Sequence, residues 1–214
     1  MSDFAHRSRS RSVGDLAPEE RLQVLRERVR TGELDPGNLD TAAWLGHELA
    51  GLASRSLGAS RLPPPPAGPA GYDRLGSLFE VVAALGRVAV IKAGVALLES
   101  IPAEGAHARH LHDVHAALEA LLRDPGSHEV EPEFPLLLED AAVTTAQNLY
   151  SIVHRVAADS SRLSLDTDAR WLAGAAPYLS PPQVAACVST TVGDWLLWEA
   201  KPVDLKAVLE AIEP

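Results

Sequence analysis

The stretch that decides the fold is DRLGSLFEVVAALGRVAVIKAGVALLES, residues 73–100. On a helix drawn through it, Ala, Val, Leu and Ile fall on nearly every side, and a helix that is apolar all round is normally buried among other elements. The part from Leu78 to Leu98 would also be long enough to cross a bilayer. However, Arg87 and Lys92 lie near its middle, where each would cost roughly 2.5–3.5 kcal/mol. We therefore expect one long central helix of a helical bundle rather than a transmembrane span.

The chain on both sides of this segment is helical as well. Apolar spacing and end signals predict further helices over about residues 18–31, 38–57, 104–123, 136–158, 167–178, 181–199 and 204–212. The alternating pattern typical of a β-strand is not found. The sequence thus predicts an all-α protein, either an irregular helical bundle or a short α-solenoid of about seven to eight helices.

Composition divides the chain into four parts. Residues 1–14 mix arginine with serine and are predicted to be a disordered tail. Residues 15–58 are predicted to form a helical hairpin. Residues 59–72 contain five prolines, which favour a stiff polyproline linker. Residues 73–214 would then form the helical bundle.

The charge of the chain bears on its partners. The net charge is −10 at pH 7, and residues 61–214 contain eleven Lys and Arg against twenty Asp and Glu, which gives −9. Such an acidic chain argues against nucleic acid as the ligand, because binding to phosphates needs clustered cations, but it suits a basic protein partner. Glu129, Glu131 and Glu133 alternate along a proline-bounded segment and are candidates for contacts with that partner. The sequence leaves open whether the chain also forms a homo-oligomer.

The sequence favours a cytoplasmic location. Cys187 is the only cysteine, so no intramolecular disulfide forms and nothing points to an oxidising compartment. The N-terminal residues contain no apolar stretch of the length found in signal peptides.

Trp195 and Trp198 form a pair at i and i+3 in GDWLLWEA, residues 193–200. Such a pair either anchors the core or forms a hot spot of an interface, where tryptophan is enriched. Both interpretations stay open, and we keep the two residues as interaction candidates.

The segment HARHLHDVH, His107–His115, contains half of the eight histidines. At about 100° per residue, His110 and His115 flank the apolar face of the predicted helix and His112 points outward, so the rings do not converge. His112 and His115 could share one metal ion, and His110 could pair with Asp113. A zinc site needs three or four ligands, so at least one more would come from elsewhere in the fold. The cluster is therefore either a solvated helix face or the zinc site of a metal-dependent enzyme.

Two stretches resemble known proteins. VLRERVRTGELDPGNLDTAAWLGHELA, residues 24–50, resembles the N-terminal helical hairpin of poorly characterised all-helical proteins of high-G+C bacteria. Residues 80–125, ending in HLHDVHAALEALLRDP, are similar to helical proteins described as immunity proteins of polymorphic toxins. The resemblance implies a helical, non-enzymatic, partner-binding protein and supplies no catalytic residue to carry over. The arginine-serine tail, the polyproline linker and the acidic residues 129–140 depart from both patterns.

Taken with the resemblance, the sequence leads to two functional expectations. The first is a non-enzymatic helical interaction module, immunity-like or with a regulatory or adaptor role, that engages a basic protein through an acidic surface and needs no cofactor. The alternative is a metal-dependent enzyme, with zinc as the metal and the His107–His115 cluster as its ligands.

Overall fold

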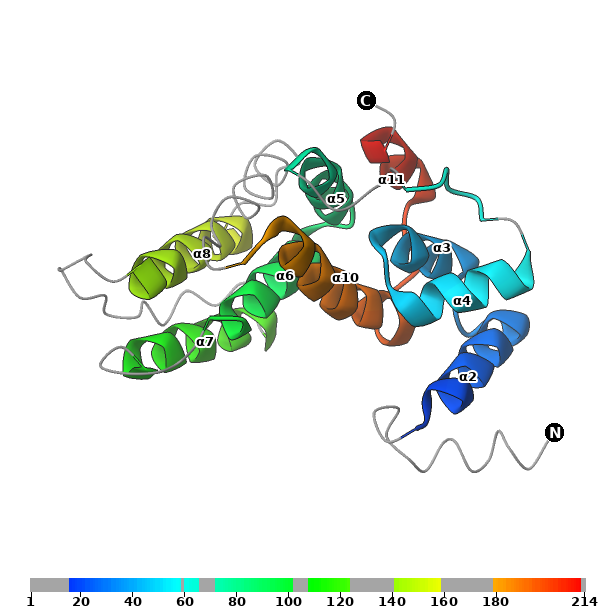
Figure 1. Cartoon of the computed structure of the whole chain (residues 1–214), viewed down its shortest axis with the longest axis horizontal. Coiled ribbons are helices and arrows are strands. Elements are labelled where there is room, and N and C mark those ends of the chain that lie inside the picture. The colour runs from blue at the N-terminus through cyan, green and yellow to red at the C-terminus, as the bar shows by residue number, and fades with distance from the viewer. Residues whose placement is uncertain are drawn as a thin grey trace. The chain divides into compact units, whose positions relative to one another are not determined.

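The computed structural model describes residues 16–58, 60–65, 72–101, 108–123, 141–158 and 179–212. These residues form nine helices and no strand, which confirms the predicted all-α class. The helices are α2 (Pro18–Thr31), α3 (Pro36–Leu45), α4 (Glu48–Leu57), α5 (Tyr72–Ala84), α6 (Arg87–Glu99), α7 (Ala108–Arg123), α8 (Ala141–Ala158), α10 (Pro181–Trp198) and α11 (Leu205–Ile212) (Figure 1).

The chain divides into two compact units. Unit 1 consists of residues 1–65 together with 193–205, and unit 2 consists of residues 66–192 together with 206–214. The first division falls inside the proline-rich stretch that composition marks as a linker. A feature that composition did not indicate is that the last turns of α10 belong to the N-terminal unit.

Several helix ends lie where local signals predict them. The helix α2 begins at Pro18 and is followed by Gly32. Ser180 precedes α10, and the side-chain oxygen of Gln183 accepts hydrogen bonds from the Ser180 backbone N–H at 2.9 Å and from its hydroxyl at 2.8 Å. These contacts fix the start of α10 at its predicted place.

Two predicted helices are wrong because each is broken into two. The expected helix 38–57 is interrupted at Gly46, which has φ +104°, and the expected helix 73–100 is interrupted at Gly86, which has φ +89°. Glycine adopts this left-handed conformation without a steric penalty, so the chain can turn there. Residues 15–58 therefore contain three helices rather than a two-helix hairpin.

The helix α3 is the core of unit 1. Eight of its ten residues are buried, and it packs against α4, which also contacts α2. Its buried Asp40 accepts hydrogen bonds from the Ser54 hydroxyl at 2.9 Å and from the Arg61 backbone N–H at 3.1 Å. The carboxylate thereby holds α4 and the segment that follows it against α3.

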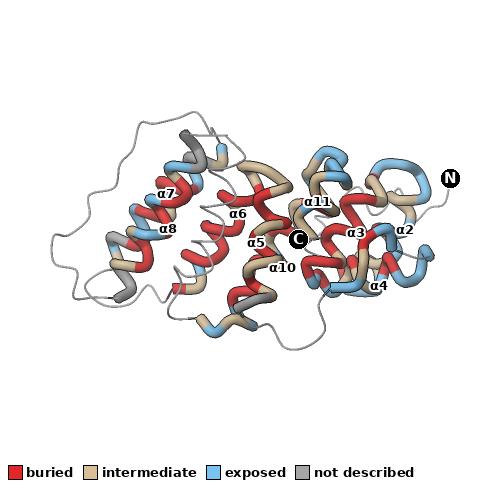
Figure 2. The backbone as a smooth tube through the Cα atoms, turned by 90° about the horizontal axis from the view of Figure 1, so that it is seen from above, coloured by how far each residue is buried: buried red, intermediate tan, exposed pale blue. Residues whose placement is uncertain are grey.

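In unit 2 the helix α6 occupies the centre. Nine of its thirteen residues are buried, it packs against both α7 and α8, and it is red along most of its length in Figure 2. The prediction of a buried central helix is thus confirmed for residues 87–99. At 13 residues, α5 and α6 are each about 20 Å long, against a hydrocarbon core of about 30 Å. Within the described ranges, no helix is long and apolar enough to span a membrane.

Some predictions fall outside the described residues. They are the disordered tail 1–14, the helix 167–178 and the N-terminal turns of the helices expected to begin near residues 104 and 136.

Candidate functional site

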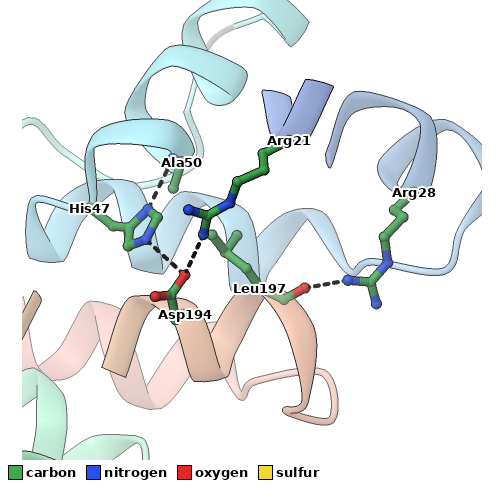
Figure 3. Close-up of polar contacts among 6 residues, drawn as sticks. All are labelled: Arg21, Arg28, His47, Ala50, Asp194 and Leu197. Carbon is green, nitrogen blue, oxygen red and sulfur yellow. Dashed lines mark hydrogen bonds and ion pairs between the residues drawn. The ribbon is translucent and has the colours of Figure 1, made fainter. Parts of the chain in front are cut away.

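One polar cluster of unit 1 is centred on His47, the residue that directly precedes α4 (Figure 3). Its side chain is only 7% exposed. The ring Nδ1 accepts a hydrogen bond from the backbone N–H of Ala50 at 3.2 Å and so caps the start of α4. Because Nδ1 is an acceptor, the ring proton lies on Nε2, which donates to Oδ1 of Asp194 at 3.3 Å.

Asp194, on α10, joins three segments of unit 1. The same Oδ1 atom also accepts a hydrogen bond from Nη2 of Arg21 on α2 at 3.2 Å. The hydrogen bond from His47 is the main reason that the pKa of Asp194 lies below its usual range; the charge of Arg21 acts in the same direction, and partial burial acts against it. The carboxylate is therefore ionised at neutral pH and holds α2, α10 and the α3–α4 junction together.

The geometry of the His47–Asp194 pair indicates a structural role. In a hydrolase triad, one ring nitrogen of the histidine contacts the carboxylate and the other contacts the nucleophile. Here the second nitrogen contacts the backbone N–H of Ala50. Neither nitrogen is left to accept a proton from a substrate, so the pair positions helices.

Removing the charge of Asp194 is expected to weaken unit 1 in a pH-dependent way. The folded-state pKa lies below the unfolded value of about 4, so the ionised carboxylate stabilises the fold above pH 4, and this contribution is lost as the pH falls toward the folded pKa. Asp194→Asn should lower the free energy of unfolding by about 1 kcal/mol at pH 7, because the 41% exposed side chain is partly screened. The difference from the natural protein should shrink between pH 5 and pH 2.

This prediction can be checked by urea unfolding followed by tryptophan fluorescence, since Trp44, Trp195 and Trp198 of the four tryptophans lie in unit 1. The matched control is Asp113→Asn, an exposed aspartate on α7, which should leave the unfolding midpoint unchanged. A deficit of Asp194→Asn that is equal at pH 7 and pH 3 would contradict the electrostatic explanation.

A second cluster surrounds Arg28 of α2. Its Nη1 donates to the backbone carbonyl of Leu197 at 2.6 Å (Figure 3), and its guanidinium carbon lies 5.0 Å from the centroid of the Trp198 ring. Its Nε is 3.9 Å from a carboxylate oxygen of Glu33. Burial lowers the pKa of Arg28, and the charge of Glu33 opposes this effect. The arginine thus satisfies a carbonyl at the C-terminal end of α10, where cations are favourable.

The side chain of Asn38, on α3, holds the chain that follows α10. Its amide nitrogen donates to the carbonyls of Leu196 and Lys201, both at 3.1 Å, and approaches the carbonyl of Ala200 at 3.4 Å. Its amide oxygen accepts from the backbone N–H of Val203 at 2.9 Å. With 1% exposure, this residue satisfies backbone groups that water does not reach.

A cavity of about 340 Å³ opens beside these two clusters, within unit 1. It is bounded by Arg28, the turn of residues 32–36, Asn38 and the C-terminal end of α10 with the residues that follow it. A cavity of this size can receive a ligand group.

The predicted interaction residues are placed as follows. Trp195 and Trp198 are both partly exposed on the part of α10 that belongs to unit 1, and the ring of Trp198 is covered on one face by Arg28. Glu129, Glu131 and Glu133 lie outside the described residues.

The histidine cluster lies on α7 of unit 2. His112 and Asp113 are exposed, and Nε2 of His115 lies 3.1 Å from Oε1 of Glu99 on α6. His107 and the side chain of His110 fall outside the described residues. Among the side chains that the structure does describe, no three His, Cys, Asp or Glu are grouped to hold a metal ion. What the structure adds is the partner of His115, because its hydrogen bond with Glu99 links α7 to α6.

Comparison with known proteins adds no relative. No family model, curated protein or solved structure matches the chain.

Sequence reasoning missed His47, Asn38 and Asp194. Their partners are separated from them by 147 residues for His47–Asp194 and by 158 for Asn38–Leu196, so no local spacing marks them. The one signal in the sequence was the position of Asn38 at the predicted start of a helix. An asparagine side chain at such a position often forms hydrogen bonds with backbone groups.

Proposed function

We propose that this protein is a non-enzymatic helical interaction module, immunity-like or with a regulatory or adaptor role, that binds a basic protein through an acidic surface. The observation that carries the proposal is the distribution of charge. Residues 124–140, between α7 and α8, contain six Asp and Glu and no Lys or Arg, so they account for six of the net ten negative charges. The described charges of α7 itself, Arg109, Asp113, Glu119 and Arg123, cancel.

The arrangement of polar groups in unit 1 fits this role. The side chains of His47, Asp194 and Asn38 form hydrogen bonds with one another or with the backbone. These bonds hold the helices of unit 1 together. The resemblance of residues 80–125 to helical proteins described as immunity proteins supports the same role. A concentrated negative charge would attract a positively charged partner, speed encounter and disfavour acidic competitors.

Replacing Glu129, Glu131 and Glu133 together by glutamine is expected to slow association with the partner. The partner is first captured with tagged protein from the native host at low salt, then purified and measured by surface plasmon resonance. We expect the association rate to fall about tenfold at 25 mM salt, and the difference to fade at 300 mM, because salt screens exposed charges.

The matched control is the triple variant Glu19→Gln, Glu48→Gln and Glu119→Gln, which removes the same charge from exposed positions spread over three helices. It should change the association rate far less. An association rate that is independent of salt, or equal losses in both triple variants, would contradict binding through this acidic segment.

A further inference from the structure

The cavity of unit 1 has room for one long side chain. Its volume of about 340 Å³ is at the lower end of the range of ligand pockets. Its walls include the apolar side chains of Leu34, Pro36, Leu197 and Pro202. Such walls suit a hydrocarbon stem whose polar end reaches a charged group.

The charges around the cavity favour a cation. Its lining contains two carboxylates, those of Glu33 and Asp35, against one cation, Arg28, which binds the Leu197 carbonyl and whose Nε lies 3.9 Å from Glu33. Asp35 is the second carboxylate of the lining; its Oδ1 accepts the backbone N–H of Gly37 at 2.7 Å, and no cation of the described chain forms an ion pair with it. The N-terminal end of α3 and the C-terminal end of α10 both border the cavity, and their partial charges oppose one another, so the excess carboxylate is what favours a cation.

Arg28 itself shows what this end of α10 attracts. Its side chain is only 22% exposed, and its guanidinium lies beside the helix end, against the Leu197 carbonyl and the Trp198 ring. A desolvated cation is held there only by matched acceptors. Arg28 and Leu197 also line the cavity, and Asp35 lies in the same lining.

We propose that this cavity receives a lysine or arginine side chain of the partner, with its stem between Leu34 and Pro202 and its charged end at Asp35 and Glu33. The inference rests on the proposed function in one respect, namely that the partner is a basic protein. The partner would then bind at two regions of the chain, the acidic residues 124–140 and this cavity of unit 1.

The test uses the whole chain and small probes, so it does not depend on finding the partner. The probe is Nα-acetyl-lysine N-methylamide, and its matched control is the norleucine analogue, which has the same stem without the charge. We expect saturable NMR shifts of the backbone amides of residues 32–35 and 200–203 with the lysine probe, at millimolar affinity and low salt. The norleucine analogue should produce no saturable shifts.

The variant for this test is Glu33→Gln with Asp35→Asn. Asparagine keeps the cap at the start of α3, and Glu33 is exposed, so the unfolding midpoint should remain unchanged. We expect the affinity for the lysine probe to fall at least tenfold. Absent shifts, equal shifts with norleucine, or unchanged affinity in the double variant would each overturn the cavity assignment. The proposed function fails separately, through the salt dependence of the glutamine triple variant.

Discussion

Replacing Asn38 by alanine is expected to lower the free energy of unfolding of unit 1 by about 3 kcal/mol. The change removes the donor to the carbonyls of Leu196 and Lys201 and the acceptor of the Val203 N–H. Each buried polar backbone group left without a partner costs about 1–3 kcal/mol. Water that enters the space left by the amide would hydrogen-bond some of these groups and so reduce the total loss of stability. The measurement is urea unfolding followed by tryptophan fluorescence.

Two further variants sharpen this test. Asn38→Asp keeps the size and the acceptor for Val203 but places a carboxylate oxygen against the carbonyl oxygens of Leu196 and Lys201, so it should be at least as unstable as the alanine variant. Asn148→Ala makes the same chemical change at an exposed position of α8 and should be neutral. If Asn38→Ala and Asn148→Ala unfold at the same urea concentration, the amide of Asn38 does not hold α3 to the end of α10 and the residues that follow it.

Gly193→Ala is expected to destabilise unit 1 by about 2–3 kcal/mol, although alanine is the better helix former by about 1 kcal/mol. A Cβ atom at position 193 would lie 2.6 Å from Cδ2 of His47 and 2.8 Å from its Cβ and Cγ. The His47 ring is fixed on both sides by Ala50 and Asp194. It therefore has little freedom to move away, and α10 would be displaced.

The matched control is Gly51→Ala in α4, where the nearest atom to an added Cβ is Nη1 of Arg55, the end of a flexible side chain, at 3.4 Å. This variant should gain about 0.5–1 kcal/mol. A double-mutant cycle assigns the contact, because a His47→Gly background removes the Cβ as well as the ring, and there the added methyl at position 193 should cost much less. An equal cost in both backgrounds would show that the clash lies elsewhere.

Local signals in the sequence predict the helix ends at Pro18 and Ser180, but not the breaks at Gly46 and Gly86. An isolated glycine costs only about 1 kcal/mol inside a helix, so from sequence it reads equally as an interior residue or as an end. The start of α4 was hidden for a second reason. Its cap is His47, and histidine is not among the residues that usually mark a helix start.

The polar contacts of unit 1 could not be predicted from the local sequence either, for a different reason. The density of histidines at 107–115 attracts attention, yet the most deeply buried histidine that the structure describes is the isolated His47. Its partner Asp194 and the partners of Asn38 come from the other end of the chain. Such contacts depend on which helices pack together, and that choice is made by burial of apolar surface over the whole unit.

The composition of unit 1 from two distant segments has a consequence for biosynthesis. A ribosome that has made residue 65 must add 128 more residues to reach Gly193, which takes roughly 6–26 s at about 5–20 residues per second. During this interval the amide of Asn38 and the ring of His47 lack their partners on α10. The helices α2, α3 and α4 therefore depend on a segment that is translated later, and their contact surface for α10 stays uncovered until residues 193–205 have been made.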